Sequence, residues 1–214
     1  APQFILSFIN QWKNKGLLPK DVIIKKRIPL ERAILNVYKY YQERLKILNS
    51  CDFGDLILLC VNMFENNPDI LELYHNNFKY ILVDEYQDSN YIQSKWLNLL
   101  AKKNNNICCV GDDDQSIYSW RGAEIKNFLE FDKIYENTKI IRLEKNYRST
   151  QNILSVASKL IENNQNRVGK KLFTNGESGD LVSLNCYRSV KDEAIDISDK
   201  IEKYKKDFSL NNMA

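Results

Sequence analysis

The sequence predicts an α/β fold in which a parallel sheet with flanking helices follows a helical region. Three apolar runs, Tyr80 to Val83, Ile107 to Val110 and Lys139 to Leu143, are continuous rather than alternating, which is typical of strands buried in a parallel sheet. Segments with helical apolar spacing separate these runs, as expected where helices connect parallel strands. The first fifty residues show helical spacing only, so we expect the sheet to begin after them.

The other elements follow in order from apolar spacing and from turn residues. A helix is expected to start at Ser149 or Thr150, because either residue can cap the apolar face that follows. A polar, glycine-containing connection separates this helix from the last strand. The remaining expected elements are helices over residues 4–15, 29–50 and 192–204 and a strand over residues 181–187.

The composition favours a globular protein of a reducing compartment. The chain has 214 residues, of which 43% are hydrophobic and 28% charged, and a net charge of +3 is too mild to imply nucleic acid by itself. Its five cysteines are an odd set that includes the neighbours Cys108 and Cys109, which argues against a disulfide framework. We therefore expect a cytoplasmic protein.

Zinc and membrane sites are not expected. The sequence has no CxxC pair and a single histidine, His75, which we interpret as structural or exposed. No apolar stretch approaches the roughly 18 residues of a membrane span, and the first residues lack the basic region of a signal peptide. The first residue is not methionine, so we expect a piece of a longer polypeptide.

Carboxylates gather where the first apolar run ends. In "YILVDEYQDSN", residues 80–90, Asp84 and Glu85 directly follow the run and Asp88 comes shortly after. Ligands of open parallel sheets collect at the carboxyl ends of strands. There an aspartate can hold Mg²⁺ while a neighbouring glutamate activates water, as in nucleotide hydrolases. A surface acidic turn would look the same, so this pair alone leaves both interpretations open.

Two further stretches carry a family resemblance. The second apolar run leads into "VGDDDQSIYSWRGA", residues 110–123, and the third leads into "LEKNYRST", residues 143–150. Together with "DEYQD", they resemble motifs II, III and IV of the UvrD/PcrA/Rep family of superfamily 1 DNA helicases. The resemblance covers about residues 20 to 200, and it departs from the common pattern at Tyr86, where phenylalanine is frequent, and at the variable Ser119.

The resemblance implies roles in ATP hydrolysis for five residues. Asp84 matches the Walker B aspartate that holds Mg²⁺, and Glu85 matches the residue that activates the hydrolytic water. Gln115 matches the glutamine that senses the terminal phosphate. Tyr147 matches the tyrosine that lies against the adenine, and Arg148 matches the arginine that reaches the terminal phosphate from the second motor domain.

The resemblance also implies a path for single-stranded DNA along Tyr118, Trp120 and Arg121, with Trp120 stacking on a base. Aromatic stacking is a sequence-tolerant way to hold single strands. A tryptophan in a polar loop is otherwise hard to explain, whereas Trp96 and Trp12 fit helical faces and are interpreted as packing residues.

A phosphate-binding loop is missing from the sequence. Such a loop needs GxxxxGK[ST], but the only Gly-Lys pair, Gly169-Lys170, is followed by Lys171 and has Asn164 where the first glycine should be. We therefore expect a partial RecA-like fold of the P-loop NTPase type. Its expected parts are the end of a helical insertion subdomain (1–50), the second half of the first motor domain (51–143) and the beginning of the second (144–214).

Three functions are compatible with these features. The first is a segment of an ATP-dependent helicase and translocase that acts on single-stranded DNA and on duplex junctions in repair or replication restart, the segment alone being inactive. The second is a degenerate remnant that binds single-stranded DNA or protein without hydrolysis. The third is a two-metal nuclease that uses Asp84, Glu85 and the aspartates at 112–114, but it leaves Trp120 and Arg148 unexplained. A partial RecA-like sheet would also expose the edge of a strand that is normally paired, so we expect that the fragment can associate with itself.

Overall fold

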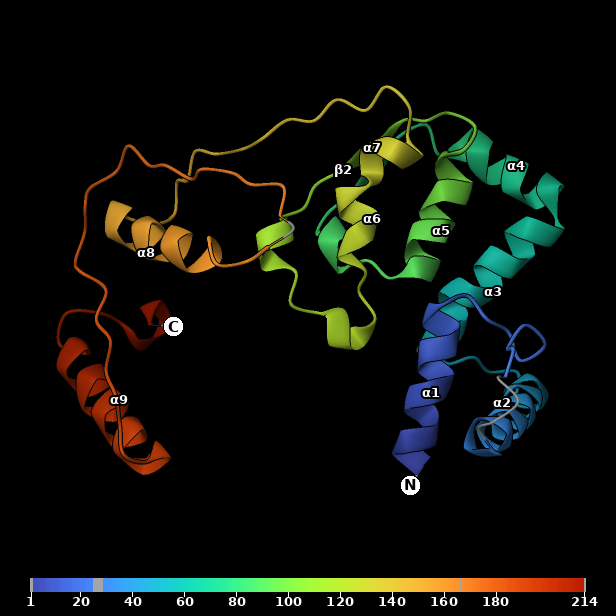
Figure 1. The fold of residues 1–214 in the computed structure, drawn as a ribbon, viewed down its shortest axis with the longest axis horizontal. Coiled ribbons are helices and arrows are strands. Elements are labelled where there is room, and N and C mark those ends of the chain that lie inside the picture. Colours follow the sequence, from blue (N-terminus) through green and yellow to red (C-terminus); the bar gives the residue numbers. More distant parts are fainter. Residues whose placement is uncertain (1, 25–28, 166, 214) are drawn as a thin grey trace. The chain divides into compact units, whose positions relative to one another are not determined.

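The computed structural model describes residues 2–24, 29–165 and 167–213 (Figure 1). Short 3-10 helices are labelled η. The first half of the chain contains α1 (Pro2–Asn14), α2 (Pro29–Ile47), α3 (Phe53–Asn66), α4 (Pro68–Asn77), β1 (Ile81–Val83), η1 (Tyr86–Asp88), α5 (Tyr91–Ala101) and β2 (Ile107–Cys109). The second half contains η2 (Asp113–Gln115), η3 (Ser119–Arg121), α6 (Ile125–Leu129), α7 (Phe131–Ile134), α8 (Gln151–Ile161), α9 (Val190–Tyr204) and η4 (Leu210–Asn212).

The chain forms two compact units. The first unit comprises Ala1–Arg142 together with Asn164–Lys170, and the second unit comprises Leu143–Asn163 together with Lys171–Ala214. The chain therefore passes from one unit to the other three times. Each unit is described by itself below.

The sheet of the first unit contains two parallel strands. β1 pairs with β2 in the register Ile81↔Ile107 and Val83↔Cys109, and α5 lies in the connection between them. Parallel strands need such a crossover. The two strands thus end at the same edge, where the sequence predicts the site. The prediction of strands in the first two apolar runs is confirmed.

The predictions of a third strand at 139–143 and a last strand at 181–187 are wrong for the described structure, which forms no strand there. Ile140, Ile141 and Leu143 are exposed, by 64%, 69% and 79%. A strand needs a neighbouring strand for its backbone N–H and C=O groups. Apolar composition alone therefore does not make these segments strands. Among the described residues of the second unit, parallel pairing is limited to an isolated bridge between Lys145 and Phe173.

The helix predictions are confirmed with small shifts of their ends. The helices expected over 4–15 and 29–50 appear as α1 and α2, and the helix expected over 192–204 appears as α9. α8 has Thr150 as its N-cap residue, one of the two residues expected there. Among the described helices, none has the length and apolar character that crossing a membrane would require.

The core of the first unit lies between α3 and α5. Leu58 and Val61 of α3 pack with Ile92 of α5, and Trp96 packs against this cluster as expected. The predicted packing role of Trp12 is also confirmed, since its ring stacks on Tyr38 with centroids 5.9 Å apart.

His75 has a structural role and lies buried at the end of α4. Its Nε2 atom is 2.9 Å from the carbonyl oxygen of Leu99 in α5. The imidazole therefore joins two helices. All five cysteines are free.

A buried ion cluster joins α1 to the start of α3. The Nζ atom of Lys13 is fully buried, 2.7 Å from Asp52 and 2.8 Å from Asp55. Asp52 and Asp55 also form a capping box that begins α3. A buried charge is tolerated only when it is paired and hydrogen-bonded. This cluster fixes α1 against α3, and the end of α1 in turn contacts the candidate site.

Candidate nucleotide and nucleic-acid site

The loop after β1 carries two open carboxylates. Asp84 and Glu85 are both exposed, and in the described part of the chain neither forms an ion pair. Asp84 Oδ1 accepts the backbone N–H of Glu85 at 3.0 Å. Glu85 has φ 51° and ψ 41°, a left-handed conformation that costs a residue other than glycine about 1–2 kcal/mol. A strained carboxylate at a strand end is a frequent feature of functional sites.

Gln87 fixes the Glu85 side chain and connects it to the loop after β2. Gln87 is buried, and its Nε2 donates to Glu85 Oε2 at 2.7 Å. Its Oε1 accepts the backbone N–H of Asp112 at 3.0 Å. A Cβ atom on Gly111 would lie 2.7 Å from this same oxygen, so only glycine allows the two loops to approach so closely. Sequence reasoning gave Gln87 no role.

Tyr86 anchors the same loop in the core. Its buried hydroxyl lies 3.1 Å from Ser94 Oγ, and its ring packs edge-on against Phe131 with centroids 5.7 Å apart. Burial raises the pKa of this phenol, so it stays neutral and acts as a hydrogen-bonding group. The departure from phenylalanine is therefore accommodated by a partner for the added hydroxyl.

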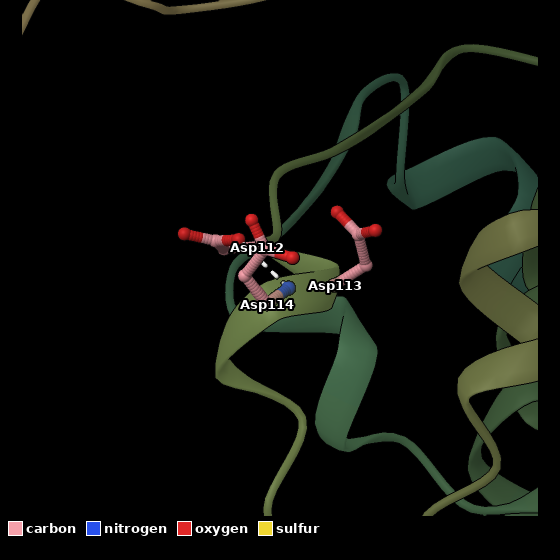
Figure 2. Close-up of side chains that lie close together, drawn as sticks. All are labelled: Asp112, Asp113 and Asp114. Carbon is pink, nitrogen blue, oxygen red and sulfur yellow. Dashed lines mark hydrogen bonds between the residues drawn. The ribbon is translucent and has the colours of Figure 1, made fainter. Parts of the chain in front are cut away.

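The loop after β2 carries three consecutive carboxylates (Figure 2): Asp112 is the N-cap residue of η2, and Asp113 and Asp114 lie in its first turn. Asp112 Oδ1 accepts the backbone N–H of Asp114 at 3.0 Å, and Asp112 Oδ2 accepts Gln115 Nε2 at 2.7 Å. Gln115 itself is exposed. Asp112 thus orients the amide predicted to sense the terminal phosphate.

These carboxylates lie close enough together to hold a metal ion, but cations of the protein already pair with two of them. Arg167 binds Asp114 through two hydrogen bonds of 2.9 and 2.6 Å, and Lys170 pairs with Asp112. Burial raises the pKa of Asp112, but hydrogen bonds from Lys170 and Gln115 outweigh it and hold the pKa below its ordinary value. This pairing argues against the two-metal nuclease.

The predicted DNA-contacting residues form one cluster. The Arg121 guanidinium lies 4.8 Å from the centre of the Tyr118 ring and 4.6 Å from that of Trp120. Trp120 remains 73% exposed. A guanidinium over both rings is attracted to each of them, and most of the Trp120 side chain remains accessible to solvent.

The end of α1 supports this cluster. Asn14 Nδ2 donates to the Arg121 carbonyl at 3.2 Å, and Asn14 Oδ1 accepts from Asn90 Nδ2 at 3.2 Å. Gly122 follows with φ 92°, and a Cβ atom there would lie 3.1 Å from the Asn14 amide. The left-handed backbone and the close Asn14 amide both favour glycine at this position. Asn14 and Asn90 were not expected as site residues, because only the folded chain brings residues 14, 90 and 121 together.

Tyr147 and Arg148 lie in the second unit, on an exposed turn. Asn146 Oδ1 accepts the backbone N–H groups of Arg148 at 2.9 Å and of Ser149 at 2.7 Å, which fixes this turn. Lys145 lies over the Tyr147 ring, with Nζ 5.0 Å from its centre. Tyr147 is 84% exposed, so its ring face is accessible.

Comparison with known proteins gives the same family for both parts of the chain. Residues 2–136 match the model of the UvrD/REP helicase N-terminal domain, and residues 141–214 match that of the UvrD-like helicase C-terminal domain. The chain is 47% identical over 212 residues to a probable DNA helicase II homolog of Rickettsia felis, covering 99% of this chain and 32% of the relative.

Two other relatives give the same picture. The chain is 44% identical over 193 residues to the ATP-dependent DNA helicase PcrA of Leuconostoc citreum, covering 90% of this chain and 26% of the relative. It is 43% identical over 201 residues to DNA helicase II of Escherichia coli, covering 94% and 28%. The chain thus spans about a third or less of the length of these relatives. Because the N-terminal model alone matches more than half of it, the chain belongs to the UvrD/REP family of DNA helicases.

Proposed function

We propose that this chain is a segment of an ATP-dependent DNA helicase that moves along single-stranded DNA and unwinds duplex in repair or replication restart. One observation carries the proposal: Gln87 joins Glu85, the expected water-activating residue, to the loop that bears Gln115, the expected phosphate sensor. A hydrolase needs these two groups in a fixed relation, because the attacking water and the terminal phosphate must be held in line.

Asp84 fits the role of a Mg²⁺ ligand. It is an exposed carboxylate at a strand end, and in the described part of the chain no hydrogen bond reaches its Oδ2 atom. Asp84 would hold the Mg²⁺ that accompanies ATP, and the ion would supply positive charge that offsets the charge developing on the transferring phosphoryl group. Glu85 would accept a proton from the attacking water, and its left-handed backbone together with Gln87 would keep its carboxylate aimed.

The isolated chain is proposed to be inactive. No GxxxxGK[ST] loop is present in the sequence to bind the phosphates of ATP. The DNA-contacting roles of Tyr118, Trp120 and Arg121 do not need that loop, since stacking and cation–π contacts act on single strands directly.

The experiment uses the full-length helicase, in which this segment is joined to a Walker A loop and to the rest of the second motor domain. Arg148→Ala should lower DNA-stimulated ATP turnover by about 10³-fold or more, the lower end for an arginine that stabilises the charge of the transferring phosphoryl group. Nucleotide binding should change far less, because the phosphate loop remains. Phosphate release and nucleotide titration measure the two quantities.

Arg188→Ala is the matched control, since Arg188 is another exposed arginine of the second unit. It should leave turnover near that of the parent. If Arg148→Ala retains more than about a tenth of the parent turnover, Arg148 is not the phosphate-reaching arginine and the proposed roles are wrong at this position.

A module that binds single-stranded DNA without hydrolysis is the second candidate. It is favoured by the cluster of Tyr118, Trp120 and Arg121, which forms within the first unit alone. The same experiment separates the two functions. A full-length protein that binds oligonucleotides without DNA-stimulated turnover would support the binding module.

A further inference from the structure

A short basic segment, Arg167–Lys170, lies apart from its sequence neighbours. By its contacts it belongs to the first unit, whereas the residues up to Asn163 and from Lys171 onward belong to the second. By sequence it lies within the match to the C-terminal helicase domain, residues 141–214. The chain thus leaves the second unit, contacts the first, and returns.

All three aspartates of the loop after β2 contact this basic segment. Asp114 receives the Arg167 guanidinium through two hydrogen bonds, Asp113 Oδ2 accepts the Val168 N–H at 2.7 Å, and Asp112 pairs with Lys170. The four charged side chains of these pairs are 13–22% exposed. Two ion pairs and a backbone hydrogen bond at successive positions specify one register of the segment, which a diffuse charge attraction would not do.

The contact with Lys170 reaches Gln115 through a single carboxylate. Asp112 Oδ1 is the oxygen that pairs with Lys170, and Asp112 Oδ2 is the oxygen that accepts from Gln115 Nε2. Fixing one oxygen of a planar carboxylate also fixes the other. The Gln115 amide is therefore oriented by a residue more than fifty positions away, and its own Oε1 stays available because Gln115 is exposed.

We propose that Lys170 and Arg167 are positioning residues for the reaction, which hold the loop of residues 112–115 so that Gln115 presents its amide to the terminal phosphate. The inference rests on the proposed function. It assigns to the acidic loop a ligand within the same polypeptide, in place of a metal ion. The orientation of the Gln115 amide would also depend on a segment whose sequence neighbours on both sides belong to the second unit.

The docking is tested first on the 214-residue chain by hydrogen exchange of the Val168 amide. Asp114→Asn and Lys170→Gln should each speed exchange about fivefold, the equivalent of about 1 kcal/mol for an ion pair at a partly exposed position. Asp132→Asn and Lys171→Gln, which remove the same charges at exposed positions, are the controls and should leave the rate unchanged. The exchanged pair Asp114→Arg with Arg167→Asp should restore protection.

The positioning role is tested in the full-length helicase. Lys170→Gln should lower kcat about tenfold through misplacement of the sensor, with a much smaller change in KM. Lys170→Arg, which keeps the charge, should restore most of kcat, and Lys171→Gln should have no effect.

The two experiments separate the ways in which the inference can fail. Unchanged exchange at Val168 would mean that the segment is not docked, which overturns the inference and leaves the proposed function standing. Faster exchange with unchanged kcat would show a structural contact only and would overturn the positioning role. A full-length parent without ATP turnover would overturn the proposed function, and with it the positioning role, while the exchange result would still establish the docking.

Discussion

The two acidic loops of the first unit follow neighbouring parallel strands, yet, among the residues that the structure describes, the carboxylates of one loop are unpaired and two of the other loop are paired with cations of the chain. After β1, Asp84 and Glu85 are exposed and no cation of the described chain pairs with them. After β2, Asp112 and Asp114 are paired with Lys170 and Arg167. Carboxylates that the protein itself pairs with cations are fixed parts of its structure, whereas exposed, unpaired ones remain accessible to a cation from solution. Acidic residues at a strand end are therefore not equivalent candidates for chemistry.

The largest expected effect comes from making the same charge-removing change in both loops of the full-length helicase. Glu85→Gln should lower DNA-stimulated ATP turnover by about 10²–10⁴-fold, the range for loss of a general base. Asp113→Asn should lower it by no more than about fivefold, because the amide oxygen can still accept the Val168 N–H and a partly exposed charge contributes little. Steady-state phosphate release compares the two variants, and comparable losses would show that the distinction between the loops is wrong.

A smaller effect is expected from Gln87, the residue that connects the loops. Gln87→Leu keeps a similar volume but leaves the half-buried Asp112 N–H without its acceptor, which should cost about 1–3 kcal/mol of unfolding free energy. All three tryptophans lie in the first unit, so urea unfolding followed by tryptophan fluorescence reports on that unit. Gln151→Leu, at an exposed position, is the control. Equal midpoints for the two variants would mean that Gln87 contributes nothing to the connection.

The smallest expected effect is a dependence of stability on pH at Asp112. Because its folded pKa lies below the ordinary value, near 3.9 for an aspartate, its pairing stabilises the fold above that pH, and this stabilisation disappears as pH falls through the folded pKa. The groups that contact this carboxylate are the Lys170 ammonium, the Gln115 amide and the backbone N–H of Asp114.

The parent should thus exceed Asp112→Asn by less than about 1 kcal/mol at pH 6, and the difference should shrink as the pH falls below the ordinary aspartate pKa of about 3.9. Urea unfolding at pH 6 and at a series of lower pH values measures it. A difference that grows on acidification would contradict the assigned sign.

Sequence reasoning identified what depends on local pattern. The apolar runs before Asp84 and Asp112 do form paired strands, and the short spacing of Tyr118, Trp120 and Arg121 does bring them into one cluster. The aromatic cluster needs only residues that are near one another in the chain, and the two paired strands are successive strands joined by a connection that contains α5.

What the sequence left undetermined depends on distant partners. The run at 139–143 has strand-like composition, but a strand exists only if another lies beside it. Gln87 acquires its role from the close approach that Gly111 permits. No sequence pattern assigns Lys170 a partner, because Asp112 is far away along the chain.

The threefold passage of the chain between its units has a consequence for how the polypeptide could be divided. If the backbone were cut between Arg142 and Leu143, the piece beginning at Leu143 would still carry Arg167 and Lys170, the two cations that seat on the aspartates of the other piece. These two ion pairs would then join the two pieces. We therefore expect that a protein made as two chains divided at this position would reassemble. Raising the salt concentration would weaken this association, because salt screens ion pairs at partly exposed positions.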